Sequence, residues 1–267
     1  MRVVTWNVNS LRARLPRVLE LLAEHRPDVV CLQETKCTPR AFPKDELTQA
    51  GYAAVHHSAG QWAGVALLAR SGLALSEPRL GLPGEPVATE ARWCEATVAG
   101  IRFASVYVPN GRDLESPEFA RKLSFLEAMT RRASAMRPAL RLIAGDMNIA
   151  PSDLDVYDPA AFSHSTHVTP DERSRLEQIL VQGLIDAYRR LHPKEVQFTW
   201  WDYRQGHFHR GLGLRIDLLM VDEQLDAALL SCGIDRDYRK GAKPSDHAPV
   251  LLELSDQTPG SAVQPSG

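Results

Sequence analysis

The sequence predicts an α/β fold in which two packed sheets are flanked by helices. Short apolar segments rich in β-branched residues, each bounded by polar residues, glycine or proline, indicate buried strands. The clearest of these segments span residues 3–8, 28–33, 64–69, 101–108, 140–144, 216–221 and 249–254. Strands outnumber helical segments and often follow one another directly, which argues against a simple alternating βαβ sheet.

Helical patterns separate some of these strands. Residues 10–25 keep apolar side chains at helical spacing, with Ser10 placed as the N-cap. A second helix is predicted over 117–136, where a Ser-Pro pair marks the start. A third helix is predicted over about 170–181, after Thr169. These helices supply the layers outside the two sheets.

The chain has 267 residues, which is enough for one large domain or two small ones. No linker, repeat or low-complexity segment divides it. We therefore predict a single domain over residues 1–255. The last residues, 256–267, are rich in Ser, Gly, Pro and Gln, and a disordered tail is predicted there.

Composition is ordinary for a globular protein, with 44% hydrophobic and 24% charged residues. No apolar run is long enough for a membrane helix, and the first residues lack the pattern of a signal peptide. The sequence therefore predicts a cytoplasmic protein without a membrane partner, associated with the nucleoid if the source is bacterial. The four cysteines have no metal-ligand spacing and are predicted to be reduced and buried.

The net charge of −2 does not indicate a nucleic-acid-binding protein. The charge is uneven, however, because Lys and Arg dominate residues 121–141 and 236–243. Such segments are either solvated helix faces or a local basic surface that holds phosphates. Composition leaves both interpretations open.

Polar residues cluster at the ends of the predicted strands, namely Asn7, Glu34, Asp146, Asn148, Asp217, Asp246 and His247. Each one alone is consistent with a surface acid, a turn or a structural ion pair. All of them adjoin apolar segments, where an unpaired carboxylate is costly and a shared cation removes that cost. Oxygen ligands with one histidine and no cysteine favour a hard cation such as Mg²⁺, which serves phosphodiester hydrolysis.

Several longer motifs resemble the exonuclease III family of abasic-site endonucleases. They are LQETK (32–36), YVPNGR (107–112), GDMNIAPSDLD (145–155), FTWWDYR (198–204), GLRIDLLM (213–220) and KPSDHAPV (243–250). The resemblance runs in order over nearly the whole chain. It implies a four-layer α-β-β-α sandwich like that of deoxyribonuclease I, with two mixed sheets packed face to face and helices outside.

The resemblance also implies an activity. Family members are Mg²⁺-dependent DNA repair nucleases, with Mn²⁺ as a substitute, that cleave the phosphodiester 5′ to abasic sites in double-stranded DNA. A 3′–5′ exonuclease and a 3′-phosphatase activity accompany this cleavage. The implied partner is therefore double-stranded DNA with abasic sites or blocked 3′ ends. We expect the protein to be a monomer.

Roles at the metal site follow from the same resemblance. Glu34 is the expected principal Mg²⁺ ligand, and Asn7 and Asp246 complete or border the site. Asp146 is the expected base that deprotonates the attacking water. Asn148 is expected to hold Asp146 and a phosphate oxygen, so both residues also count toward the metal site.

The remaining catalytic roles concern the phosphate. His247 is expected to donate a hydrogen bond to it, and Asp217 to pair with that imidazole. Tyr107 is expected to steer the leaving 3′-oxygen. Asn9 stands where some members carry an acid that assists a second metal, which argues against a tightly held second cation.

The resemblance also implies which residues contact DNA. Asn110 and Arg112 are expected to bind DNA after the strand that ends at Tyr107. Trp200 and Trp201 are expected against the extruded sugar, and Leu214 at the position of a wedge in the base stack. The segment 198–215 is expected to separate a repair enzyme from a less specific double-stranded DNA nuclease of the same fold, which is the main competing hypothesis.

The remaining function classes have less support in the sequence. A secreted nuclease of the deoxyribonuclease I type would carry a signal peptide and disulfides. A lipid phosphodiesterase would expose apolar loops, and an inositol-phosphate phosphatase would cluster Lys and Arg beside the catalytic strands. A DNA-binding module with a dead site would lack at least one of the catalytic side chains, and all of them are present.

Overall fold

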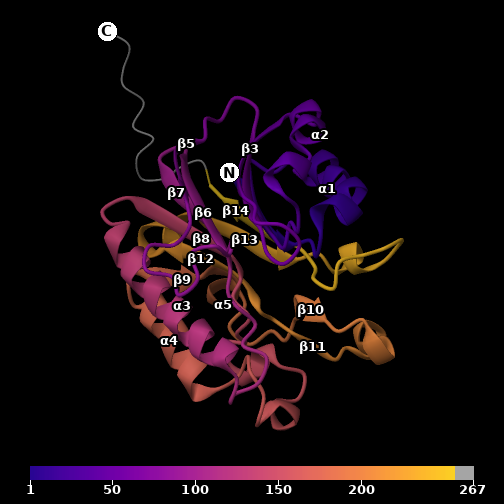
Figure 1. The fold of residues 1–267 in the computed structure, drawn as a ribbon, viewed down its shortest axis with the longest axis vertical. Coiled ribbons are helices and arrows are strands. Elements are labelled where there is room, and N and C mark those ends of the chain that lie inside the picture. The colour runs from indigo at the N-terminus through magenta and orange to yellow at the C-terminus, as the bar shows by residue number, and fades with distance from the viewer. Residues whose placement is uncertain (256–267) are drawn as a thin grey trace.

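The structure is a computed structural model that describes residues 1–255, so the tail predicted over 256–267 lies outside the described residues. Two six-stranded sheets pack face to face, and helices cover their outer faces (Figure 1). Helices α1 and α2 lie outside one sheet, and α3 and α4 lie outside the other. The predicted four-layer sandwich is confirmed.

The first sheet is mixed, because β1 runs parallel to β2 and antiparallel to β14. In spatial order its strands are β13 (Leu229–Ile234), β14 (Val250–Leu254), β1 (Arg2–Asn7), β2 (Val29–Gln33), β4 (Val65–Arg70) and β3 (Tyr52–His57). The seven segments predicted as strands are all confirmed within one or two residues of their ends, with four of them in this sheet.

The second sheet is also mixed, because β7 runs parallel to β8 while its other pairs are antiparallel. In spatial order its strands are β5 (Ser76–Leu80), β6 (Trp93–Val98), β7 (Ile101–Tyr107), β8 (Leu140–Asp146), β12 (Asp217–Asp222) and β9 (Leu184–Asp186). A separate two-stranded ribbon, β10 (Trp200–Trp201) and β11 (Gly213–Leu214), lies beside the sandwich.

The three predicted helices are confirmed. The described helices are α1 (Leu11–His25), α2 (Lys44–Gln49), α3 (Pro117–Ala135), α4 (Pro170–Leu180), α5 (Ala187–Leu191) and α6 (His207–Arg210). The side chains of Ser116 and Thr169 cap α3 and α4 as expected. Ser10 makes no side-chain cap bond, and its backbone N–H instead donates to the carbonyl of Glu34 at 2.7 Å.

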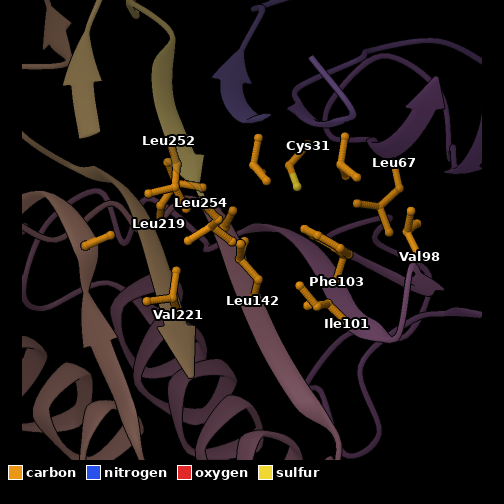
Figure 2. Close-up of a cluster of buried hydrophobic side chains, with 14 of the residues drawn as sticks. Cys31, Leu67, Val98, Ile101, Phe103, Leu142, Leu219, Val221, Leu252 and Leu254 are labelled. Carbon is orange, nitrogen blue, oxygen red and sulfur yellow. The ribbon is translucent and has the colours of Figure 1, made fainter. Parts of the chain in front are cut away.

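One apolar core fills the space between the sheets, with side chains such as Cys31, Phe103, Leu142, Leu219 and Leu252 pointing into it from both sides (Figure 2). The outer face of each sheet packs against its helices in a separate cluster. All four cysteines are buried and free, as predicted. In the described part of the chain, no helix is both long and apolar enough to cross a membrane.

Part of the positive charge in residues 121–141 turns inward. Lys122 and Arg141 are fully buried, and Arg132 pairs with the buried carboxylate of Glu95. In the second basic segment, Arg239 is buried as well. Neither segment therefore presents its full charge to solvent.

Candidate active site

The topology brings the polar strand ends to one edge of the sandwich. Parallel β1 and β2 end together at Asn7 and Gln33, next to Glu34. In the second sheet, parallel β7 and β8 end together at Tyr107 and Asp146. Antiparallel β12 begins opposite Asp146 with Asp217. The loop before β14 adds Asp246 and His247.

A compact group of acidic and imidazole side chains lies at this edge. Glu34, Asp146 and His247 each offer a ligand atom, and these atoms all lie within 4.8 Å of one another. The side-chain amide of Asn7 donates to Glu34 Oε1 at 2.8 Å and to Asp146 Oδ2 at 2.9 Å. The oxygen ligands available to a cation are the two carboxylates and the neighbouring side-chain amides, which fit a hard divalent cation.

Asp146 is almost fully buried, with 1% of its surface exposed. The pKa of Asp146 is raised to about 7, mainly by burial. Repulsion from Asp217 and Glu34 adds to this effect, and together they outweigh the opposing charge of His247. The backbone N–H of Asn148 donates to Asp146 Oδ1 at 2.9 Å. Asn7 and Asn148 therefore fix the Asp146 carboxylate through different oxygens.

His247 lies between two carboxylates. Its Nδ1 is 2.8 Å from Asp217 Oδ2, and its Nε2 is 3.7 Å from Asp146 Oδ2. Burial alone would lower the pKa of His247, but the charges of Asp217 and Asp146 reverse this effect and raise its pKa to about 10. The ring is therefore protonated at neutral pH, donates to Asp217 from Nδ1 and keeps Nε2–H for an anion.

Asn148 and Tyr107 complete the inner part of the site. Asn148 has a positive φ of 50°, a conformation that asparagine tolerates better than most residues. Its side-chain amide donates to the carbonyl of Val108 at 2.9 Å. Burial, together with the carboxylates of Glu34 and Asp146, holds the pKa of Tyr107 well above its usual value, so its hydroxyl stays protonated.

Asp246 lies beside the compact group rather than in it. Its Oδ1 accepts from the Asn9 amide at 2.9 Å and its Oδ2 accepts from Trp200 Nε1 at 3.1 Å. Lys36 Nζ lies 2.6 Å from both Glu34 Oε2 and Asn9 Oδ1. Hydrogen bonds through Lys36 and Asn9 therefore link Glu34 to Asp246.

The DNA-contact residues expected from the sequence have different placements. Asn110 and Arg112 are exposed beside the site, and Trp200 is half-buried. Trp201 and Leu214 have no exposed surface, which does not fit their predicted contact with DNA. Trp201 packs edge-on against Phe208 beneath Arg239, and Leu214 belongs to a small apolar cluster with Ala150, Val156 and Ile216.

Three residues lie at or next to the site although the sequence did not predict a role for them there: Lys36, Lys122 and His167. The Nε2 atom of His167 lies 3.1 Å from Asn148 Oδ1. Burial and the charge of Lys122 lower the pKa of His167 to about 3, so the ring is neutral. Lys36 lies in a motif that marks the family. No sequence pattern marks Lys122, which approaches from α3, or His167, which approaches from the loop before α4.

Residues 4–247 match the model of the Endonuclease/Exonuclease/phosphatase family. The chain belongs to this family. Exodeoxyribonuclease III of Haemophilus influenzae is 31% identical to it, over 95% of this chain and 100% of the relative. The expected family and the assignment as a nuclease of the hydrolase class are therefore confirmed.

Solved structures of this family agree with the fold. A 3′ phosphatase from Neisseria bound to a product DNA hairpin superposes with a TM-score of 0.92 at 38% identity, covering 96% of this chain and 99% of that one. An AP endonuclease from Archaeoglobus fulgidus gives a TM-score of 0.91 at 34% identity, covering 95% and 99%.

Proposed function

We propose that this chain is a Mg²⁺-dependent DNA repair nuclease that cleaves 5′ to abasic sites and removes phosphates or nucleotides from 3′ ends, with Mn²⁺ as a substitute cation. The observation that carries the proposal is the group formed by Glu34, Asp146 and His247, whose ligand atoms lie within 4.8 Å of one another. The names of the relatives, an exodeoxyribonuclease, a 3′ phosphatase and an AP endonuclease, support the substrate class.

The same group has the donor atoms that a divalent cation needs. Glu34 and Asp146 would hold it, with Asn7 and Asn148 beside them and Asp246 at the border. A bound cation supplies positive charge to the phosphate oxygens as negative charge develops there.

The proton chemistry belongs to the chain itself. Asp146 accepts a proton from the attacking water, and Asn7 and the backbone of Asn148 hold its two oxygens in a fixed orientation for this role. His247 donates from Nε2 to a phosphate oxygen, and Asp217 holds the ring in that orientation through the 2.8 Å contact at Nδ1. Tyr107 ends β7 directly beside Asp146 at the end of β8, and its hydroxyl steers the leaving 3′-oxygen.

The proposal extends to the setting of the reaction. Asn110, Arg112 and Trp200 are at least partly exposed beside the site and contact double-stranded DNA. Both sheets contribute to the core between them and to the site, which supports a single domain over residues 1–255. The protein acts as a monomer in the cytoplasm, at the nucleoid if the source is bacterial.

A second candidate is an enzyme that acts mainly at 3′ ends and cleaves abasic sites poorly. Sequence identity to relatives of known activity favours it. The Neisseria 3′ phosphatase is 38% identical to this chain, whereas the Archaeoglobus AP endonuclease is 34% identical. Both candidates use the same catalytic group, so only the substrate preference separates them.

One experiment tests the proposal and separates the two candidates. The protein is incubated with three duplexes, one with an internal abasic analogue, one with a nick ending in a 3′-phosphate and one undamaged, and the ends formed are mapped. Mg²⁺ is expected to support processing of the damaged duplexes, and EDTA to abolish it while circular dichroism shows an intact fold. Glu34→Gln is expected to lose at least about a hundredfold in turnover.

Each pattern of products has a distinct meaning. Processing of the 3′-phosphate alone assigns the chain to the second candidate. Equal cleavage of damaged and undamaged duplexes indicates the less specific nuclease. If no duplex is processed with Mg²⁺ or Mn²⁺, the proposed function is wrong.

A further inference from the structure

A fully buried lysine lies directly behind the candidate site. Lys122, on α3, has no exposed surface. Its Nζ donates to the backbone carbonyls of Asn148 at 2.6 Å and Asn110 at 3.1 Å, and to Thr166 Oγ1 at 3.0 Å. It also forms an ion pair with Glu172 of α4. Lysine is rarely buried to this extent, and only when its charge is paired.

The ammonium group joins three loops that are separate in the sequence. Asn110 follows β7, Asn148 follows β8, and Thr166 lies in the loop that leads into α4. The first two loops carry proposed DNA-binding and catalytic side chains. Lys122 reaches all three from outside the sheet, because α3 and α4 pack together on that face. Its contacts thus set how these loops sit relative to one another.

Glu172 fixes the ammonium from the other side. One of its oxygens accepts from Thr166 Oγ1 at 2.6 Å and from the backbone N–H of His167 at 2.9 Å. The other accepts from the backbone and hydroxyl of Thr169 in the capping box of α4. Apart from Lys122, each of these donors belongs to the segment that leads into α4. The Lys122–Glu172 pair is therefore anchored to the start of that helix.

The loop after β7 closes tightly over this pair. Gly111 has a φ of 92°, and a Cβ built there would lie 2.9 Å from Thr166 Oγ1 and 3.0 Å from Lys122 Cδ. Such distances are too short for ordinary contacts, so a side chain at this position would displace the lysine stem. The close packing leaves the loop little freedom to shift relative to Lys122.

Asn148 links the pair to the chemistry. Its carbonyl accepts from Lys122, and its own backbone N–H donates to Asp146 Oδ1 at 2.9 Å. Its side-chain Oδ1 lies 3.2 Å from the amide of Asn110, whose carbonyl is bound by the same ammonium. A change at Lys122 is therefore transmitted to the orientation of Asp146 through one residue.

We propose that Lys122, held by Glu172, is a positioning residue of this nuclease that keeps Asn148 and Asn110 in the arrangement that orients Asp146. The inference rests on the proposed function. An apolar side chain at this position would fill the same space but would bond none of the four acceptors. The competing explanation is a buried ion pair that stabilises the fold and has no influence on the reaction.

The chain offers a matched control for that explanation. Arg141 is also buried, with 1% of its surface exposed, and pairs with Asp222 at 2.7 Å. It also donates to the backbone carbonyls of Ala133 and Gly183, neither of which belongs to the candidate site. Lys122→Met and Arg141→Met each remove a buried cation and leave a buried carboxylate, so both are expected to lower thermal stability.

Only Lys122→Met is expected to slow the reaction. At a temperature where both variants are folded, kcat is expected to fall about tenfold to a hundredfold for Lys122→Met, since a small misplacement of catalytic groups has effects of this size. Its KM is expected to change less than about threefold, and both constants of Arg141→Met to stay within about twofold of the wild type. Equal kcat losses in the two variants would overturn the proposal.

A double-mutant cycle tests whether Lys122 acts through Asn148, which a purely stabilising role of Lys122 would not produce. In single-turnover assays, Lys122→Met is expected to have little further effect in the Asn148→Ala background, because it acts through Asn148. Full additivity of the two effects on the rate contradicts the proposal. Should Lys122→Met fail to fold, Glu172→Gln keeps the shape of the carboxylate and enters the same cycle, with the same expectation and the same contrary result.

The activity of the wild-type protein on the same duplexes distinguishes a failure of the proposed function from a failure of the proposal for Lys122. A wild type that processes no duplex refutes the proposed function itself. An active wild type whose kcat is matched by folded Lys122→Met refutes only the role of Lys122.

Discussion

Strands β8 and β12 run antiparallel side by side, and the pair carries buried charges at both of its ends. At one end Arg141 meets Asp222, with 2.7 Å between Nε and Oδ2. At the other end Asp146 lies opposite Asp217, with His247 between them. The same two strands thus support a cluster of balanced charge and a cluster of unbalanced charge.

The balance of charge and hydrogen bonds differs at the two ends. Each charge in the Arg141 pair has one opposite partner, and the backbone carbonyls of Ala133 and Gly183 accept from Nη1 and Nη2 of the guanidinium. At the other end, the three carboxylates of Asp146, Asp217 and Glu34 face only two cations, the imidazolium of His247 and the ammonium of Lys36, which pairs with Glu34. Like charges in a buried group resist ionisation together. The excess of negative charge therefore identifies the Asp146 end of the strand pair as the end that can bind a cation and transfer protons.

The largest expected effect is on turnover at the unbalanced end. Asp146→Asn keeps the shape of the side chain but cannot accept a proton, so kcat is expected to fall by about 10² to 10⁴. Thermal stability without metal is expected to stay equal or to rise, because one of three mutually repelling carboxylates is removed. Single-turnover kinetics and thermal melts of metal-free protein measure both. A large loss of stability would mean that Asp146 serves the fold.

The balanced end is expected to behave in the opposite way. Asp222→Asn leaves Arg141 buried without an opposite charge, and breaking a buried pair in this way costs about 3–5 kcal/mol of stability. The kcat of the folded variant is expected to stay within about twofold of the wild type, since the pair lies at the far end of both strands. Urea unfolding and the nuclease assay test this together. If Asp222→Asn lowers activity but not stability, the Arg141 end of the strand pair does not have the purely structural role assigned to it.

The smallest expected effect is a difference in the pH at which two buried carboxyl groups titrate. Asp155, which pairs with arginines, is compared with Asp146, which lies among other carboxylates. Burial alone would raise the pKa of Asp155, but Arg215, 2.6 Å away, and Arg189 outweigh this and lower its pKa below the usual value. A carboxyl with a lowered pKa in the folded state contributes stability above about pH 4, and this contribution is lost as the pH falls further.

Asp155→Asn is therefore expected to flatten the decline in unfolding free energy between about pH 5 and pH 3, measured by urea titration. In the metal-free wild type, carboxyl ¹³C NMR is expected to show Asp146 titrating near pH 7, well above Asp155. The same direction of shift at both residues would refute the link between charge balance and pKa.

Much of the architecture follows from local patterns in the chain. Strands such as β1, β2 and β8 contain runs of mostly apolar residues, and Ser116 and Thr169 lie where helices begin. The strands that no pattern predicted lie mainly at the edges of the sheets. Strand β5 (Ser76–Leu80) is exposed along its whole length, so no apolar alternation marks it. Strand β5 therefore forms because β6 offers backbone hydrogen bonds to it, and not because its own side chains favour burial.

The candidate site divides in the same way. Glu34, Asp146 and His247 were predictable, because each adjoins an apolar segment in a motif that marks the family. Burial of individual side chains was not predictable. Trp201 and Leu214 were expected to face DNA, and the ribbon they form packs them against loops distant in the sequence.

Lys122 shows most clearly what only the packing of distant elements decides. In the sequence it is one of several basic residues on an amphipathic helix, and nothing local separates it from the exposed Arg121 beside it. In the folded chain, acceptors from residues 110, 148, 166 and 172 converge on its ammonium group. Local patterns determine which residues form strands and helices. The direction in which a charged side chain turns depends on partners contributed from elsewhere, because burial of a charge is stable only when those partners meet it.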